Sequence, residues 1–122
     1  MKPYIKILSK INPLGFNCVL YARSRASGLP FGLWTYADKV KIINKKKPEK
    51  GDVAIIKTTQ IWGHVAIVTH VGRMHLTIQE GNWKTGKVTE RHGTWQALNI
   101  TGYFRKEALD KKEGYGTMLY ST

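Results

Sequence analysis

The spacing of apolar residues changes near the middle of the chain, and this change strongly restricts the possible folds. Before Pro48, apolar residues recur at helical spacing in two short segments, residues 17–27 and 33–43. After the turn-forming residues 48–52, β-branched residues gather in short runs bounded by glycine and polar residues. Helices followed by closely spaced strands indicate an α+β fold, with N-terminal helices packed on an antiparallel sheet.

The first helical segment has clear start and stop signals. Asn17 is suited to cap a helix, and Gly28 followed by Pro30 predicts its end. This prediction places Cys18 in the first turn. The apolar stripe of the helix consists of Cys18, Val19, Ala22 and Ala26.

The length of 122 residues is enough for one domain. We expect strands at residues 53–56, 64–71 and 75–80, and weaker ones near 86–91 and 100–105. The domain is predicted to span residues 15–105. Residues 1–14 have mixed polarity and are expected to form an irregular N-terminal arm, and residues 106–122 a C-terminal surface tail.

The chain is strongly basic, with 20 Lys and Arg residues against 8 Asp and Glu residues, a net charge of +12. Such a charge predicts attraction to polyanions, which include nucleic acid, anionic lipid and anionic wall polymers. The run Lys45, Lys46, Lys47 is interpreted as a solvated loop. No apolar run approaches the ~20 residues of a membrane span, and no continuous apolar segment of secretory type follows Met1.

A single cysteine, Cys18, excludes an intramolecular disulfide and a multi-cysteine metal site. Three interpretations remain for this residue. It is a buried small apolar side chain, a free thiol with a function, or a link to another chain.

The register of a predicted hairpin brings candidate catalytic residues onto one face of the sheet. If residues 72–74 form a three-residue loop, Val71 faces His75, and His64 then faces Asn82 further along the ladder. Because diagonal neighbours lie ~7 to 8 Å apart, His64 also reaches Glu80 on the same face. A two-residue loop would instead turn both polar partners to the other face.

Apart from the polar residues at its end, this face of the hairpin is apolar. Its apolar residues are Ala66, Val68, Leu76 and Ile78. We expect the first helix to pack on this face, with its N-terminus toward His64. The thiol of Cys18 would then meet the imidazole, and both the helix dipole and an imidazolium lower a thiol pKa. The set comprises a nucleophile, a base and an orienting carboxylate.

Each residue of this set also has an ordinary structural interpretation. His64 alone is more often a hydrogen-bonded structural histidine, Glu80 a surface carboxylate and Asn82 a turn residue. The tryptophans can be core or rim residues, since aromatic burial is their usual use. Gly63 is expected to let another backbone or a substrate approach closely. Only the coincidence of these residues favours a catalytic site.

Five segments in order resemble the successive signatures of the CHAP family, the cysteine, histidine-dependent amidohydrolase/peptidase domain. They are N-C-V-L-Y-A-R (17–23), P-x-x-G-D-V-A (48–54), G-H-V-A-I-V (63–68), I-Q-E-G-N-W (78–83) and G-Y-F-R (102–105). The resemblance implies a papain-like fold and hydrolysis of peptidoglycan amide bonds. It also implies Cys18 as nucleophile, His64 as base, Glu80 as its orienting residue and Asn82 as a further polar residue of the site.

One departure from the family pattern concerns the oxyanion. The family commonly has Gln before the cysteine, whereas this chain has Asn17, which keeps the amide donor but is one methylene shorter. The backbone N–H of Cys18 remains a second oxyanion donor. Some relatives bind calcium through an acidic loop, but no Asp or Glu precedes Asp38 here, so we predict no metal and no cofactor.

The resulting hypothesis is a lysin-like, monomeric cysteine hydrolase, either an N-acetylmuramoyl-L-alanine amidase or a peptide endopeptidase. The residues Trp34, Trp62 and Trp83 are predicted to wall its groove, and the positive charge to hold it on anionic wall polymers. We expect the protein to act at the bacterial cell wall. Three routes to the wall are open: the protein is a phage lysin released from the host cytoplasm, a component of the virion, or a secreted effector.

Two other functions are considered. One is a wall-binding module on the same fold without catalysis. The other is a basic nucleic-acid-binding domain that uses lysines and tryptophans as phosphate contacts and stacking platforms. The presence of all four polar residues speaks against the first function, and the second leaves Cys18, His64 and Glu80 unexplained.

Overall fold

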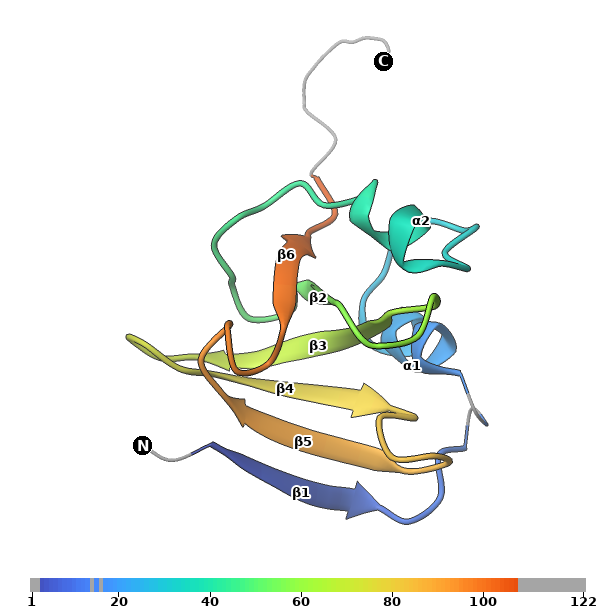
Figure 1. Cartoon of the computed structure of the whole chain (residues 1–122), viewed down its shortest axis with the longest axis vertical. Helices are drawn as coiled ribbons and strands as arrows, with labels where there is room; N and C mark the ends of the chain where they lie inside the picture. The colour runs from blue at the N-terminus through green and yellow to red at the C-terminus, as the bar shows by residue number, and fades with distance from the viewer. Residues whose placement is uncertain (1–2, 14, 16, 108–122) are drawn as a thin grey trace, which may run out of the picture.

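The computed structural model describes residues 3–13, 15 and 17–107, and these residues form one sheet with two short helices (Figure 1). The sheet has six strands in the order β1-β5-β4-β3-β2-β6, and all neighbouring strands are antiparallel. The predicted α+β class is therefore confirmed in its sheet-rich form. The elements are β1 (Tyr4–Ser9), α1 (Cys18–Arg25), α2 (Tyr36–Val40), β2 (Val53–Ile56), β3 (His64–Val71), β4 (Leu76–Gly81), β5 (Val88–Gly93) and β6 (Ile100–Phe104). Residues 108–122 of the predicted tail lie outside the described residues.

The expected irregular arm contains a strand, so this part of the prediction is wrong. Tyr4–Ser9 forms β1, an edge strand that pairs with β5. The ring of Tyr4 stacks on His92 at 5.1 Å, and its hydroxyl donates to Glu90 at 2.9 Å. The apolar side chains of β1 remain partly exposed. Because neither face of this strand is buried, its sequence does not show the regular alternation of apolar and polar residues by which a strand is recognised. Pairing with a distant strand stabilises β1.

The β3–β4 hairpin differs from the prediction at its turn but matches it near the site. Val71 lies opposite Leu76 rather than His75, so the turn comprises four residues. An irregularity at Thr69 then shifts the pairing by one residue, and Val68 lies opposite Ile78, as predicted. The bulge therefore restores the expected register on the side of the hairpin that carries His64 and Glu80.

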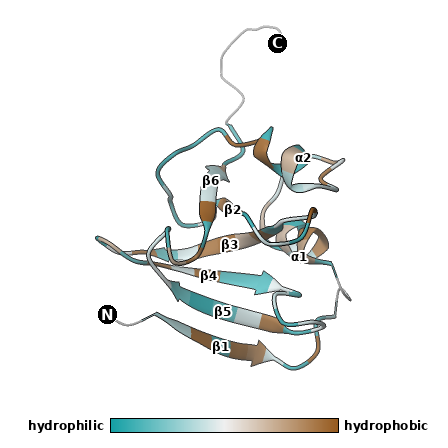
Figure 2. Ribbon diagram, viewed as in Figure 1, coloured by the Kyte–Doolittle hydropathy of each residue, from teal (hydrophilic) through white to brown (hydrophobic). Residues whose placement is uncertain are grey.

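Helix α1 packs on the face of the sheet opposite to the one we expected. Its Ala22 belongs to a buried cluster with Val65 and Ile67. The face that carries Ala66 and Val68 is filled instead by residues from β2, from β6 and from the segment before β6. The apolar residues of that second cluster are Ala54, Ile56, Ala66, Val68, Leu76, Ile78, Leu98, Ile100 and Tyr103. Figure 2 shows β3 apolar along much of its length, as is typical of a strand covered on both faces.

A glycine at the end of β4 permits the close approach of α1. A Cβ atom added to Gly81 would lie 2.7 Å from the Cβ of Tyr21 and 2.7 Å from the amide nitrogen of Asn12. Real Cβ atoms do not come this close to other heavy atoms, so only glycine fits without a shift of the helix. This contact holds α1 at the end of the sheet where β3 begins and β4 ends (Figure 1).

Helix α2 is shorter than the predicted segment 33–43 at both ends. It begins at Tyr36 because Thr35 caps it and forms a capping box with Asp38. Its Lys39 is only 2% exposed. The ammonium group donates to the carbonyl oxygens of Leu33 at 2.9 Å and Trp62 at 2.8 Å. This buried lysine therefore connects two loops that are distant in sequence.

Neither helix in the described part of the chain has the length and apolar character that a membrane crossing requires.

Replacement of Gly81 by alanine is expected to destabilise the fold by about 1 to 3 kcal/mol, because the new methyl group forces α1 away from the sheet. The measurement is unfolding in urea, monitored by circular dichroism. Gly93→Ala is the matched control, since a Cβ there would have its nearest contact at 3.6 Å. Equal losses of stability in the two variants would contradict this account.

Candidate active site

A groove of about 720 Å³ lies where the N-terminus of α1 meets the start of β3. Its lining includes Cys18 and His64 from these two elements. The structure also places on its lining the other residues that the sequence singled out, namely Asn17, Trp34, Trp62, Asn82 and Trp83. Glu80 lies behind them, fully buried. The hairpin register and the helix cap thus bring together residues from four separate segments.

Cys18 is the first residue of α1, and the preceding residue fixes this end of the helix. The side-chain oxygen of Asn17 accepts hydrogen bonds from the backbone N–H groups of Val19 at 2.9 Å and Leu20 at 3.0 Å. The cap thus accepts hydrogen bonds from the second and third N–H groups of the helix. It does not bind the first N–H group, which belongs to Cys18. The amide oxygen of Asn17 is committed to capping, which leaves its NH₂ group as the part able to donate to a substrate.

The thiol of Cys18 is in an environment that favours its ionised form. Burial raises the pKa of this thiol, but a hydrogen bond to His64 and the charge of its ring outweigh burial, so the pKa lies below its ordinary value. A backbone hydrogen bond from Val65 and the charge of Lys39 act in the same direction. Cys18 is half-buried and belongs to the lining of the groove.

His64 lies between the thiol and a carboxylate. The Nε2 atom of its ring is 3.1 Å from Oε1 of Glu80, and this contact leaves Nδ1 for the thiol of Cys18. Burial lowers the pKa of the imidazole, but the hydrogen bonds to Cys18 and Glu80 outweigh burial and raise it above its ordinary value. A raised histidine pKa beside a lowered thiol pKa favours a thiolate–imidazolium pair.

Glu80 is fully buried and yet held in its ionised form. Arg91 donates to it through Nη2 at 2.8 Å and through Nε at 3.1 Å, and the hydroxyl of Thr89 donates to Oε2 at 3.0 Å. Burial raises the pKa of the carboxyl group, but the hydrogen bonds from His64 and Arg91 outweigh burial and lower it. The carboxylate therefore keeps its charge and orients the ring of His64.

Trp83 covers this network on the side of the groove. The guanidinium carbon of Arg91 lies 3.5 Å from the centroid of the indole ring. The ring of His64 lies 5.1 Å from the same indole, inclined by 56°. The indole thus restricts access of water to the His64–Glu80–Arg91 network.

The sequence reasoning missed Arg91 and Lys39. Arg91 is the diagonal neighbour of Glu80, because Glu80 lies opposite Thr89 and Ile78 lies opposite Arg91. Pairing the weak strand near residues 86–91 with the strand that carries Glu80 would have indicated this contact. For Lys39, no sequence pattern distinguishes a buried lysine from a surface one.

Two residues have local structural contacts within the site. Asn82 adopts a left-handed backbone conformation with φ 65°, and its side-chain oxygen accepts from the N–H of Gly86 at 2.9 Å, as a turn residue does. A Cβ at Gly63 would lie 3.0 Å from Tyr36 and 3.1 Å from the carbonyl oxygen of Ile56. The close approach expected at Gly63 is therefore made by the protein itself.

The arrangement of thiol, imidazole and carboxylate can perform nucleophilic acyl transfer. Among the residues described by the structure, no group of three or more His, Cys, Asp and Glu side chains could hold a metal ion.

Comparison with known proteins identifies the family. The model of the CHAP domain matches residues 9–82, which include Cys18, His64, Glu80 and Asn82. The segment 102–105, which we compared with the family signatures, lies beyond the matched residues. No curated protein matches the chain, and no solved structure matches it. CHAP domains are generally hydrolases that act on peptidoglycan. The match covers more than half of the sequence, and the chain therefore belongs to the CHAP domain family.

Proposed function

We propose that this CHAP domain is a cysteine hydrolase that cleaves amide bonds in bacterial peptidoglycan, acting at the cell wall in the manner of a lysin. One observation carries the proposal. Cys18 lines an open groove, and its thiol is hydrogen-bonded to His64, whose Nε2 contacts the buried carboxylate of Glu80 at 3.1 Å. A structural cysteine would need neither the basic partner nor the carboxylate behind it.

In the first half of the reaction, the thiolate of Cys18 attacks the carbonyl carbon of the scissile amide. The carbonyl oxygen becomes an oxyanion, which accepts hydrogen bonds from the backbone N–H of Cys18 and from the NH₂ group of Asn17. The imidazolium of His64 gives the Nδ1 proton to the leaving nitrogen, and the C–N bond breaks. The products are a free amine and a thioester on Cys18.

In the second half, His64 acts as a base. Its Nδ1 takes a proton from water, and the resulting hydroxide attacks the thioester carbon. The C–S bond breaks, the acid product leaves, and the thiolate–imidazolium pair is restored. The carboxylate of Glu80 stabilises the imidazolium and keeps the ring oriented while the proton moves.

The groove supports a peptide substrate. Its walls include Trp34 at 73% and Trp62 at 55% exposure, and such exposed indoles offer apolar contacts to the side chains of a stem peptide. The hydrogen bonds from Lys39 to the loops that carry these tryptophans hold the two walls at a fixed separation. The bond cleaved is either that between muramic acid and L-alanine or a peptide bond of the stem or cross-bridge. Mass spectrometry of the released muropeptides distinguishes these products.

Replacement of Cys18 by alanine is expected to reduce hydrolysis of purified peptidoglycan by at least about 10³-fold, because no other group in the groove can form the thioester. The measurement is the release of new amino termini. His64→Ala is expected to cause a loss of similar size, because the two residues act as one unit. Equal product from wild-type protein and Cys18→Ala would refute the thiol mechanism.

The pH dependence of the thiol tests the ion pair. The rate of alkylation by iodoacetamide is expected to reach half its maximum at a pH below the ~8.5 of a free thiol, since the pKa of Cys18 is lowered. In His64→Ala this midpoint should move to higher pH. Hydrolysis should fall as the pH drops below the thiol pKa, and fall again as the pH rises above the raised pKa of His64. An unchanged midpoint in His64→Ala would contradict the pair.

We expect Arg91 to contribute to the lowered pKa of Cys18 through its contact with Glu80. In Arg91→Gln the carboxylate loses a charged partner, so the pKa of Glu80 rises and its support of the imidazolium weakens. We expect a loss of stability of about 3 kcal/mol and an alkylation midpoint of Cys18 at higher pH. The control is Arg25→Gln at the exposed end of α1. A variant that is only less stable, with the midpoint unchanged, would show that Arg91 has no part in tuning the site.

A further inference from the structure

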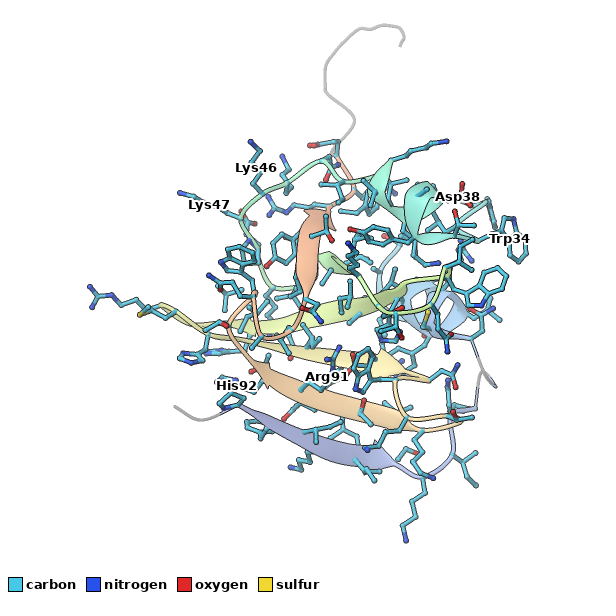
Figure 3. All side chains as sticks on the ribbon, in the orientation of Figure 1. Trp34, Asp38, Lys46, Lys47, Arg91 and His92 are labelled. Carbon is cyan, nitrogen blue, oxygen red and sulfur yellow. The ribbon has the colours of Figure 1, made fainter. Side chains whose placement is uncertain are left out.

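A second groove, of about 670 Å³, lies at the other end of the sheet from Cys18. It is formed by the segment between α2 and β2, the β3–β4 turn, strand β6 and Trp95, which precedes β6. In Figure 1 the first two of these segments lie at the opposite end of the sheet from α1, and in Figure 3 Lys46 and Lys47 lie on the opposite side of the view from Trp34. We call it the basic groove.

We propose that the basic groove binds an anionic wall polymer built of phosphodiester-linked sugar or polyol units. The inference rests on the proposed function, because that function brings the domain to a wall where such polymers accompany peptidoglycan. It assigns the attraction expected from the net charge of +12 to one defined site.

The charge of the basic groove has one sign. Its lining includes the exposed side chains of Lys46, Lys47 and Arg73, and none of the described lining residues is acidic. Lys45 also lines the groove but forms an ion pair with Glu107 at 3.3 Å, which leaves Lys46, Lys47 and Arg73 as the cations that face a ligand without an acidic partner in the lining. Cations gathered in a concave surface focus the potential and favour a ligand with repeated negative charges.

The lysine run is held in place by the sheet, although the side chains of Lys46 and Lys47 are exposed. The backbone of Lys45 pairs with that of Tyr103 through two hydrogen bonds of 3.0 Å. Arg105 donates to the carbonyl oxygen of Lys47 at 3.3 Å and is itself bound by the buried Asp52 at 2.7 and 2.8 Å. The backbone that carries the cations is therefore ordered before a ligand binds, which lowers the entropy cost of binding.

The basic groove also has exposed apolar surface. Trp95 is 54% exposed and Met74 is 72% exposed, and both line it. An exposed indole beside cations suits a ligand that alternates phosphates with rings or carbon chains, since the ring face packs on the latter. A free phosphate ion would use only the cations. A polymer bound here leaves the Cys18 groove open at the opposite end of the sheet.

The test compares two triple variants that each remove three positive charges. Lys46→Gln/Lys47→Gln/Arg73→Gln alters the basic groove, and Lys6→Gln/Lys10→Gln/Lys41→Gln removes three exposed charges outside both grooves. Binding of each 122-residue protein to a synthetic poly(glycerol phosphate) is measured by calorimetry at several salt concentrations. For the groove variant we expect at least about tenfold weaker binding and a salt slope smaller by about 2. The control variant should differ from wild type by less than about threefold, because it removes only long-range, screened attraction.

Other measurements on the same proteins keep the two proposals separate. Trp95→Ala should weaken binding and leave the salt slope unchanged, because no charge is removed. Equal weakening in the two triple variants would overturn the site, and tighter binding of a single-stranded DNA of equal charge would overturn the proposed occupant.

Hydrolysis of a soluble stem peptide should be unchanged in the groove variant. If wild-type protein hydrolyses no peptidoglycan but polymer binding still depends on the groove, the proposed hydrolase function fails and the binding site stands.

Discussion

The buried carboxylate of Glu80 is the group on which the rest of the site depends. Removing a carboxylate from water is costly, and this one is compensated by hydrogen bonds from Arg91, Thr89 and His64, which come from two neighbouring strands. Only the assembled sheet supplies these donors together. The orientation of His64, and through it the ionisation of Cys18, therefore follows from correct pairing of β3, β4 and β5.

Local sequence patterns predicted the parts of the site that depend on spacing. The cap at Asn17 places Cys18 in the first turn, and the ladder places Glu80 within reach of His64. The register was right near the site for a reason that the sequence does not reveal, since the bulge at Thr69 compensates for a longer turn. The prediction of the sheet face that α1 covers was wrong. Strand β3 is apolar on both faces, and the alternation of residues alone does not indicate which of two apolar faces a helix covers.

The features that were missed all depend on contacts between distant segments. Arg91 acquires its role only when β5 pairs with β4, and β1 is held by its pairing with β5. Lys39 is buried because three carbonyl oxygens from two loops surround its ammonium group. The same sheet separates two surfaces of different character, since an aromatic groove with a thiol lies at one end and a basic groove at the other.

The lone thiol has a consequence for the chemical durability of the protein. A half-buried cysteine on the lining of a groove, with a lowered thiol pKa, is susceptible to oxidation by peroxides, which gives a sulfenic acid. Cys18 is the only cysteine in the sequence, so no neighbouring thiol can convert that acid to a reversible disulfide within the chain. Further oxidation to the sulfinic acid would be permanent, and each molecule would depend on external reductants to survive oxidising surroundings.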